Sequence, residues 1–321
     1  MNMPATREHG GPDAQGVVAH DFSTNANACG PCPQALAVVR GADASRYPDP
    51  AYTQLRPVLA RLHEVAAERI VVAASASEFI FRLTGWAARG GLGRVALPVH
   101  GYGDYAQAAR AWGLATADDA PFAWACEPSS PLGQPEPGLR ERVAAGVLVA
   151  LDRAYEPLRL SGESSLAGAD LDRVWQLWSP NKALGLTGVR AAYAIAPDAA
   201  AAAQLDAMAP SWPVGAHGVA LLLAWCEPAV QQWLRESRAT LRAWKARQLA
   251  LCGELGWAPR PADANFFVAA VPGLAERRAA LRAQGIVLRD CASFGLPGHA
   301  RLGVQAPPAQ DALARAWRNL P

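Results

Sequence analysis

Short apolar runs alternate with amphipathic stretches between residues 69 and 195. Short apolar runs bounded by polar residues are typical of buried strands, and apolar residues recurring at helical spacing are typical of helices that bury one face. The runs predict strands at 69–74, 94–97, 147–151, 174–178 and 191–195. Helical spacing follows the first two strands, over Phe79 to Trp86 and around Tyr105 to Trp112. Strands that alternate with helices favour a mostly parallel α/β sheet.

The pattern changes after Trp212-Pro213-Val214-Gly215, which breaks the chain. A long helical stretch follows over 216–255, and we expect an interruption near Pro228 because proline is excluded from helix interiors. Beyond it lie predicted strands at 264–270, 286–289 and 301–304, and a helix over 277–284 that ends at Gly285. These elements predict a smaller α+β domain.

We therefore expect three parts in the chain. Residues 1–45, rich in Gly, Pro and Asn, form an N-terminal arm that joins the small domain. Residues 46–215 form a large cofactor-binding domain, and residues 216–321 form the small C-terminal domain. A chain of 321 residues is long enough to bury a substantial core in this arrangement.

Polar residues stand where four of the predicted strands end. Ser75-Ala76-Ser77 follows the first strand, Tyr102 follows the second, Asp152 closes the third, and Lys182 lies just past the fourth. Sheets of this kind bind ligands beyond the carboxyl ends of their strands. The order of these residues therefore predicts one site at one edge of the sheet.

Thirty lysines and arginines against 28 acidic residues leave a formal net charge of +2. This balance argues against a nucleic-acid partner, which requires a concentrated basic face. The sequence has no apolar run of membrane-spanning length, and its first residues lack the apolar core of a secretory signal. We therefore expect no membrane partner and a cytoplasmic location, in which the six cysteines stay mostly reduced.

Cys29-Gly30-Pro31-Cys32 has the spacing of a thioredoxin-type redox site. Such a site follows a hydrophobic strand and precedes a helix, whereas here a polar arm precedes it and Pro33 follows directly. This context disfavours a redox function. A zinc site is also disfavoured, because no second Cys or His pair has matching spacing, and we expect no metal.

Lys182 is one of two lysines in a chain whose cationic positions are otherwise arginine. Arginine stays protonated, whereas a lysine amine can lose its proton and attack a carbonyl. The chemistry expected of Lys182 is a Schiff base with an aldehyde cofactor. Lys245, in the helical run Arg242 to Arg247, is expected to be an ordinary surface lysine.

A pyridine-aldehyde cofactor needs further groups besides the lysine. Its ring nitrogen needs a carboxylate such as Asp152, and its ring hydroxyl needs a hydrogen-bond partner such as Tyr155. Its phosphate favours a helix N-terminus with hydroxyl groups, such as Ser75-Ala76-Ser77, and a cation such as Arg190. Tyr102 can stack on the ring. Ordinary helix capping remains an alternative for the serines, and capping or a surface position for Asp152.

The segment from Ser179 to Arg190, with the pattern Ser-x-x-Lys-x-x-Gly-Leu-x-Gly-x-Arg, resembles the lysine motif of fold-type I pyridoxal-phosphate enzymes in the class I/II aminotransferase family. Asp152-x-x-Tyr155 is similar to a second element of that family, and the resemblance covers most of the chain. It implies a large domain around a mostly parallel sheet, a smaller α+β domain, and pyridoxal 5′-phosphate bound by Ser179 and the other residues of these motifs.

The segment from Arg46 to Pro50 resembles a further element of the family. In that family its tyrosine reaches the cofactor phosphate of the neighbouring subunit. The resemblance therefore implies this role for Tyr47, and a homodimer with shared active sites.

Within the family, the chain resembles the threonine-phosphate decarboxylases of cobalamin biosynthesis. The likeness rests on His9-Gly10-Gly11, on the pattern Asp-Phe-Ser-x-Asn-x-Asn over 21–27, on Trp212-Pro213-Val214, and on 289–302. It implies that Arg289 and Arg301 bind the substrate carboxylate, for which a planar guanidinium is suited. It also implies that His9 and Asn27 meet the substrate phosphate. A surface charge at a strand edge is the alternative for Arg289.

Two positions depart from the family pattern. Ser130, in the loop 127–133, stands where the family has an asparagine that bonds the ring hydroxyl. Ser75 stands where the family has a glycine that allows close approach of the backbone. Both changes can lower cofactor affinity, but they leave the Schiff base and the electron sink in place.

The resemblance implies decarboxylation of L-threonine O-3-phosphate to (R)-1-amino-2-propanol O-2-phosphate, so a phosphorylated amino acid is the expected small-molecule partner. One alternative is an aminotransferase acting on histidinol phosphate or an aromatic amino acid, which shares every cofactor residue and differs in the His9-Gly10-Gly11 arm. The other is a cofactor-binding paralogue without catalysis, supported only by Ser75 and Ser130. The fold does not decide among them, because one scaffold hosts many chemistries.

Overall fold

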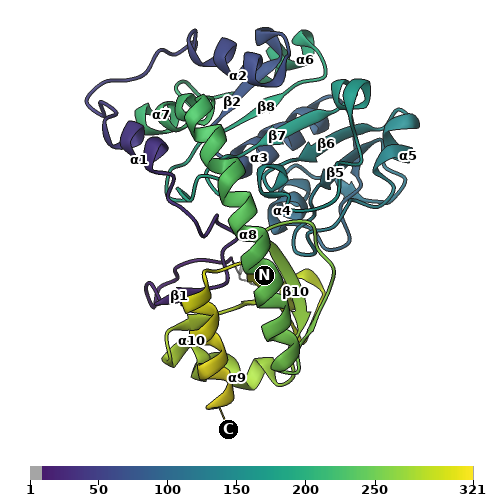
Figure 1. The fold of residues 1–321 in the computed structure, drawn as a ribbon. Helices are drawn as coiled ribbons and strands as arrows, with labels where there is room; N and C mark the ends of the chain where they lie inside the picture. Colours follow the sequence, from purple (N-terminus) through teal and green to yellow (C-terminus); the bar gives the residue numbers. More distant parts are fainter. Residues whose placement is uncertain (1–8, 321) are drawn as a thin grey trace.

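The structure, a computed structural model, describes residues 9–320. Within this range the larger sheet has five strands in the order β2-β8-β7-β6-β5 (Figure 1). Their bounds are Ile70–Ala73 for β2, Ala192–Ile195 for β8, Trp175–Trp178 for β7, Leu148–Asp152 for β6 and Phe122–Cys126 for β5. Among these five strands only β8 is antiparallel to its neighbours, β2 and β7. The predicted mostly parallel α/β sheet is confirmed.

Helices and short helical turns precede, connect and follow these strands. The helices are α2 (Leu55–His63), α3 (Ala76–Arg89), α4 (Gly103–Ala111), α5 (Leu139–Ala144) and α6 (Ala199–Asp206), and the 3-10 turns are η1 (Ala67–Arg69), η2 (Glu156–Leu158) and η3 (Gly168–Arg173). A short parallel pair, β3 (Arg94–Val95) with β4 (Ala115–Thr116), adjoins the sheet because Ala96 bridges to Ala123 of β5. The strands and helices predicted between 69 and 112 lie where the sequence pattern places them.

The pattern of the sequence did not predict β5. Its run Phe-Ala-Trp-Ala-Cys alternates aromatic residues with alanine, which is depleted in strands, and has no β-branched residue. All five residues are buried. Pairing with β6 along its whole length, rather than local propensity, makes this segment a strand.

The smaller sheet is antiparallel and has the order β12-β13-β10-β9. The bounds are Arg289–Asp290 for β12, His299–Gly303 for β13, Phe266–Ala270 for β10 and Ala258–Pro259 for β9, and α9 (Leu274–Ala283), α10 (Pro307–Arg318) and the turn η4 (Ala292–Phe294) accompany it. In the arm, β1 (His20–Asp21) pairs in parallel with β11 (Ile286–Val287). This part of the arm therefore lies with the smaller sheet (Figure 1).

The helical stretch predicted over 216–255 is two helices, α7 (Ala216–Trp225) and α8 (Pro228–Glu254). Pro228 takes the first turn of α8, where a missing N–H costs nothing, and this explains the predicted interruption. Figure 1 shows α8 running from the region of α7 to the region of β10 and α10. Although α8 has 27 residues, neither it nor another helix within residues 9–320 is long and apolar enough to cross a membrane.

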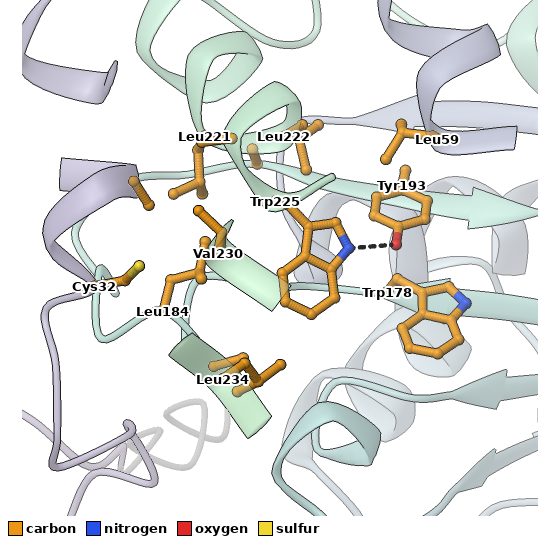
Figure 2. Close-up of a cluster of buried hydrophobic side chains, with 14 of the residues drawn as sticks. Cys32, Leu59, Trp178, Leu184, Tyr193, Leu221, Leu222, Trp225, Val230 and Leu234 are labelled. Carbon is orange, nitrogen blue, oxygen red and sulfur yellow. Dashed lines mark hydrogen bonds between the residues drawn. The ribbon is translucent and has the colours of Figure 1, made fainter. Parts of the chain in front are cut away.

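A buried cluster supports the segment that carries the lysine motif (Figure 2). Leu184 is buried there with Cys32, Leu221, Val230 and Leu234. Cys32 stands directly before the arm helix α1 (Pro33–Arg40), which packs on α7 and was not predicted. The backbone N–H of Cys32 also donates to the Leu184 carbonyl at 2.8 Å. The arm therefore anchors the chain next to Lys182.

Gly30 and Gly185 pack backbone against backbone in the same region. A Cβ on Gly185 would lie 2.9 Å from the Gly30 Cα, and the φ of Gly185 is +65°, so both packing and conformation favour glycine. Cys29 and Cys32 are free thiols, and burial raises the pKa of Cys29 to about 11. A raised pKa opposes thiolate formation, and the segment from Cys29 to Cys32 serves as a packing surface for the lysine motif.

Candidate active site

Lys182 lies in the segment between β7 and β8. Its amine is 5.3 Å from the centre of the Tyr155 ring. Its carbonyl oxygen accepts hydrogen bonds from the N–H groups of Asn27, at 2.9 Å, and Gly185, at 3.2 Å. These bonds fix the backbone from which the amine extends.

Asp152 ends β6 and is only 6% exposed. One carboxylate oxygen accepts from the Tyr105 hydroxyl at 2.7 Å, and the other accepts from the Ala154 N–H at 2.9 Å. Burial raises the pKa of Asp152, whereas these two bonds and the nearby Lys182 amine lower it. Its burial rules out the alternative of a surface acid, and its position suits a partner for a ring nitrogen.

Tyr105, on α4, is a site residue that the sequence analysis missed. Burial raises its pKa well above the ordinary value, so its hydroxyl stays protonated and donates to Asp152. Its ring stacks on Trp124 with centroids 5.1 Å apart. No local pattern distinguishes Tyr105 from a core residue, because β5 supplies Trp124 and β6 supplies Asp152.

The predicted phosphate turn leads from β2 into α3. Ser75 is the N-cap residue, and its hydroxyl accepts from the Glu78 N–H at 3.1 Å. Its φ of −169° is ordinary extended backbone, so the backbone conformation at this position does not require a glycine. Ala76 begins the helix, and the Ser77 hydroxyl lies 3.3 Å from the Tyr102 hydroxyl. The helix N-terminus and two hydroxyls together suit an anion.

Tyr102 and Tyr155 flank this part of the site. The Tyr102 ring meets Tyr105 edge-on at 5.9 Å, and burial raises the pKa of Tyr102 to about 12. Tyr155 packs edge-on against Phe266 of β10 at 4.8 Å. The hydroxyl of Tyr102 therefore stays protonated, and a tyrosine hydroxyl can donate to a bound anion or oxygen.

Ser179 and Arg190, the ends of the lysine motif, differ in their surroundings. Ser179 is buried, and its hydroxyl donates to the Asn181 side-chain oxygen at 3.0 Å. Arg190 is exposed, and within residues 9–320 no hydrogen bond or ion pair holds its guanidinium. The predicted phosphate contact of Arg190 stays a prediction.

Arg301, on β13, connects the loop of Ser130 with the arm. It donates to the Ser130 hydroxyl at 3.1 Å and to the Ser23 carbonyl at 2.8 Å. Its Nε is buried and has no partner among the described residues. The Ser130 hydroxyl thus binds Arg301. The contact with the cofactor ring hydroxyl, which the family pattern places at this position, stays a prediction for Ser130.

Arg289 faces Arg301 across the β12–β13 ladder. It is buried, so the alternative of a surface charge is wrong. Its guanidinium donates to the Ser293 hydroxyl at 2.7 Å and lies 4.8 Å from the centre of the Phe294 ring. The two arginines form a buried cationic pair beside the loop of Ser130.

The start of the arm reaches the same region. The Gly11 N–H donates to the Ser23 hydroxyl at 2.8 Å, and the His9 ring lies 6.0 Å from the Tyr102 ring. Ser23 is the residue whose carbonyl binds Arg301. The start of the arm therefore contacts both Ser23, which binds Arg301, and Tyr102.

Asn27 and Asn25 differ in how their amides are used. The Asn27 amide donates to the Ala183 carbonyl at 3.0 Å and to the Ser237 hydroxyl at 2.8 Å, and it accepts from the Cys29 N–H at 3.0 Å. Asn27 thus holds the lysine segment in place. Asn25 is also buried, yet neither polar atom of its side chain has a partner among the described residues. Sequence reasoning missed Asn25, although it stands in the same quoted pattern.

Tyr47 lies at the surface and is 78% exposed. Its ring stacks on Trp212, with centroids 4.5 Å apart, and the Trp212 indole N–H donates to the Pro48 carbonyl at 3.1 Å. A phosphate contact by Tyr47 in a neighbouring subunit stays a prediction.

Lys245 is not a surface lysine, and that expectation is wrong. It is 8% exposed, and its amine donates to the carbonyls of Ala262 and Ala264. Burial lowers the pKa of Lys245 to about 8. Hydrogen bonds to two carbonyls of a turn distant in the sequence offset the cost of burying the amine. The local helical pattern does not reveal these carbonyls.

The residues gathered here fit a pyridine aldehyde that carries a phosphate. A buried carboxylate, a lysine amine and a hydroxyl-bearing helix N-terminus meet three of the chemical demands of such a group. The side-chain amide of Asn25 and the Nε of Arg301 are buried and have no hydrogen-bond partner among the described residues. Within residues 9–320 no three His, Cys, Asp or Glu side chains gather as metal ligands.

Two comparisons of the sequence with known proteins agree on the family. The family description aminotransferase class I and II matches residues 122–320. Histidinol-phosphate aminotransferase of Symbiobacterium thermophilum is 30% identical over 335 residues, covering 93% of this chain and 90% of the relative. Threonine-phosphate decarboxylase of Salmonella typhimurium is 28% identical over 342 residues, covering 94% of this chain and 90% of the relative.

The fold also matches a solved structure. Histidinol-phosphate aminotransferase of Sinorhizobium meliloti, in complex with pyridoxal-5′-phosphate, has a TM-score of 0.80 and 22% identity, and the match covers 96% of this chain and 93% of that chain. The fold-type I architecture expected from the lysine motif is thereby confirmed. Since the family match spans more than half of the sequence, the chain belongs to the class I and II aminotransferase family.

Proposed function

We propose that this chain catalyses the decarboxylation of L-threonine O-3-phosphate to (R)-1-amino-2-propanol O-2-phosphate. The position of the His9-Gly10-Gly11 arm, between Ser23 and Tyr102, is the observation that carries this proposal. A phosphorylated amino acid presents two anionic groups, a carboxylate and a phosphate. The arm adds a second set of polar groups beside the pair Arg289 and Arg301, so both anions can be bound at once.

The cofactor of the enzyme is pyridoxal 5′-phosphate. When bound, it supplies a protonated ring that takes up the electrons of the bond broken at the substrate Cα. Asp152 would hold the proton at the ring nitrogen, and Tyr155 would meet the ring hydroxyl. Lys182 would bind the aldehyde carbon, and the N-terminus of α3 would bind the phosphate.

The arginine pair would bind the substrate carboxylate. Arg301 is held by Ser130 and by the Ser23 carbonyl, so its planar guanidinium has a preset orientation, while its Nε donates to none of the described residues. A fixed orientation matters because only a Cα–carboxylate bond perpendicular to the ring can pass its electrons into the ring. The arginines therefore serve to align the bond that breaks.

His9 and Asn25 are the residues we propose for the substrate phosphate. His9 lies beside Tyr102, and Asn25 has a buried amide without a partner among the described residues. Asn27, the residue expected from the resemblance, is already bonded to Ala183 and Ser237. We therefore transfer the proposed amide contact from Asn27 to Asn25.

A homodimer with shared active sites is part of the proposal. Tyr47 and Trp212 form a stacked aromatic pair that is largely exposed in one chain. Exposed aromatic pairs are typical of surfaces that a partner covers. A second copy of the chain would bring Tyr47 to the cofactor phosphate of the first.

The second candidate is an aminotransferase acting on histidinol phosphate or an aromatic amino acid. It is favoured by the 30% identity to a relative named histidinol-phosphate aminotransferase. The cofactor residues would be the same, but the Cα–H bond of the substrate would break instead of the Cα–carboxylate bond. Lys182 would then carry the proton away from Cα. The two candidates therefore differ in the bond held perpendicular to the ring.

The proposal is tested by incubating the cofactor-loaded enzyme with L-threonine O-3-phosphate and measuring carbon dioxide and aminopropanol phosphate. A parallel reaction holds histidinol phosphate and 2-oxoglutarate, and is measured for glutamate. We expect carbon dioxide in the first reaction and no glutamate in the second, and no product in either with Lys182→Ala. Glutamate without carbon dioxide would establish the aminotransferase instead.

A further inference from the structure

We infer that the hydroxyl group of Ser23 is a positioning element that joins the N-terminal arm and Arg301 into one unit. The inference rests on the proposed function, in which the arm and Arg301 bind the two anionic groups of one substrate. Ser23 would not touch the substrate. It would act by holding the groups that do.

The contacts of Ser23 carry this inference. Ser23 is 2% exposed, and its N–H and its hydroxyl donate to the same Asp21 carboxylate oxygen, at 2.7 Å and 2.6 Å. The hydroxyl oxygen accepts from the Gly11 N–H at 2.8 Å, and the carbonyl accepts from Arg301 at 2.8 Å. Every polar group of this one residue is therefore used, and they connect three separate segments.

The hydroxyl of Ser23 has a fixed direction. Because its hydrogen is donated to Asp21, its oxygen can only accept from the arm, which is the geometry observed at Gly11. Asp21 lies in β1, which pairs in parallel with β11, the strand directly before β12 of the smaller sheet. The arm is thus attached through Ser23 to the part of the molecule that also carries Arg301.

Close packing adds to these hydrogen bonds. A Cβ on Gly10 would lie 2.1 Å from the Ser23 carbonyl oxygen, so the arm rests directly on the atom that binds Arg301. Only glycine permits this approach. A change in the position of the arm would therefore displace the carbonyl that orients the arginine.

The chain contains a matched turn that lacks these further contacts. Ser45 donates its N–H and its hydroxyl to one Asp43 carboxylate oxygen, at 2.9 Å and 2.6 Å. This is the same local arrangement as in Asp21 and Ser23, but it stands on the exposed surface. Ser45→Ala removes the same kind of hydroxyl without removing a contact of Gly10, Gly11 or Arg301, and so it serves as the control.

The test compares Ser23→Ala, Gly10→Ala and Ser45→Ala in the cofactor-loaded enzyme. Loss of the hydroxyl removes the acceptor of Gly11, and the added methyl group of Gly10→Ala pushes the arm from Ser23 by a different route. We expect the KM for L-threonine O-3-phosphate to rise about tenfold in both variants, because the start of the arm and Arg301 are no longer held together. We also expect kcat to fall about threefold or more, because a displaced Arg301 aligns the Cα–carboxylate bond less well. Ser45→Ala should match wild type, and the visible absorbance of the bound cofactor should be unchanged in all three.

Hydrogen exchange at the Gly11 amide supplies a readout that needs no turnover. The Gly11 N–H should be protected in the wild type and lose protection in Ser23→Ala but not in Ser45→Ala. An unprotected Gly11 in the wild type, or a Ser23→Ala enzyme with unchanged KM, would overturn the inference. If the wild type protects Gly11 but releases no carbon dioxide, the proposed decarboxylation fails while the link between Ser23 and the arm stands.

Discussion

At the scale of single residues, the charge of Asp152 depends on opposing effects. Burial raises the pKa of the carboxyl group, whereas the Tyr105 hydroxyl, the Ala154 N–H and the Lys182 amine lower it. A carboxylate that holds a proton at a cofactor ring nitrogen must itself stay charged. Tyr105 is therefore the residue through which the surroundings of Asp152 can be tested.

Tyr105→Phe is expected to raise the pKa of Asp152, because a hydrogen bond that favours the charged form is lost while the burial stays. A carboxyl group with a raised pKa becomes protonated at a higher pH. When the pH is lowered, the activity of the variant should therefore fall before that of the wild type. We expect kcat/KM to drop about threefold to tenfold near pH 6 and to change little near pH 8. The pH profile of kcat/KM measures this shift.

Tyr52→Phe is the control for this measurement. Tyr52 is also a buried tyrosine, but its hydroxyl donates to the Val214 carbonyl at 2.9 Å instead of to Asp152. Its pH profile should coincide with that of the wild type. If the acid limb of Tyr105→Phe also stays in place, Tyr105 does not maintain the charge of Asp152.

At the scale of elements, α8 is attached to the active-site loop through the turn 262–264. Lys245 of α8 donates to the Ala264 carbonyl at 2.8 Å and also to the Ala262 carbonyl. The same turn donates the N–H of Asp263 to the Gly133 carbonyl at 2.6 Å, and Gly133 ends the loop that holds Ser130. One buried amine thus supports the contact between a long helix and the loop beside Arg301.

Lys245→Met is expected to lower the free energy of unfolding by about 2–3 kcal/mol, because two buried carbonyls lose their donor. The loss should depend on pH. Burial lowers the pKa of Lys245 from 10.5 to about 8, so between these values the unfolded chain binds a proton that the folded chain has released. The stability of the wild type relative to Lys245→Met should therefore rise as the pH increases through this window.

Urea unfolding at about pH 7 and about pH 9.5, with both proteins saturated with cofactor, measures this difference. Arg235→Met is the control, because Arg235 is exposed on the same helix and, among residues 9–320, its guanidinium bonds Gln232 alone, three residues away. Its effect should stay within about 0.5 kcal/mol at both pH values. Equal stability of Lys245→Met and wild type would contradict the proposed support.

At the scale of the whole molecule, one chain brings most of the proposed site together but leaves Tyr47 at its surface. Arg301 comes from the smaller sheet, Asp152 from the larger sheet, and Ser23 from the arm. Closed symmetric dimers are the commonest assemblies of identical chains. The proposal of shared sites therefore predicts a result that depends on the pairing of two different variants.

Lys182→Ala and Tyr47→Ala chains, carrying different tags, are to be coexpressed and purified as the mixed dimer. Each variant is expected to have strongly reduced activity as a homodimer. If Tyr47 acts in the neighbouring site, the mixed dimer has one site with both wild-type residues and should recover about half of the wild-type activity. If Tyr47 acts within its own chain, no site of the mixed dimer is intact and the activity stays low.

Patterns within short stretches determined much of this protein. The strands at 69–74 and 174–178 and the interruption near Pro228 follow from neighbouring residues, and the structure has them. The family and its cofactor were also predicted from local motifs and are confirmed. Periodicity, proline geometry and residue chemistry act over a few residues, so the sequence by itself carries them.

Only the tertiary structure decided the features that depend on distant partners. The segment of β5 is a strand because β6 pairs with it, and Lys245 is buried because a remote turn supplies two carbonyls. Asn25 and Asn27 look alike in the sequence. The Asn27 amide donates to Ala183 and Ser237, whereas the Asn25 amide has no partner among the described residues. Whether a polar group is buried, satisfied or left for a ligand depends on what the folded chain places beside it, and no local pattern records that.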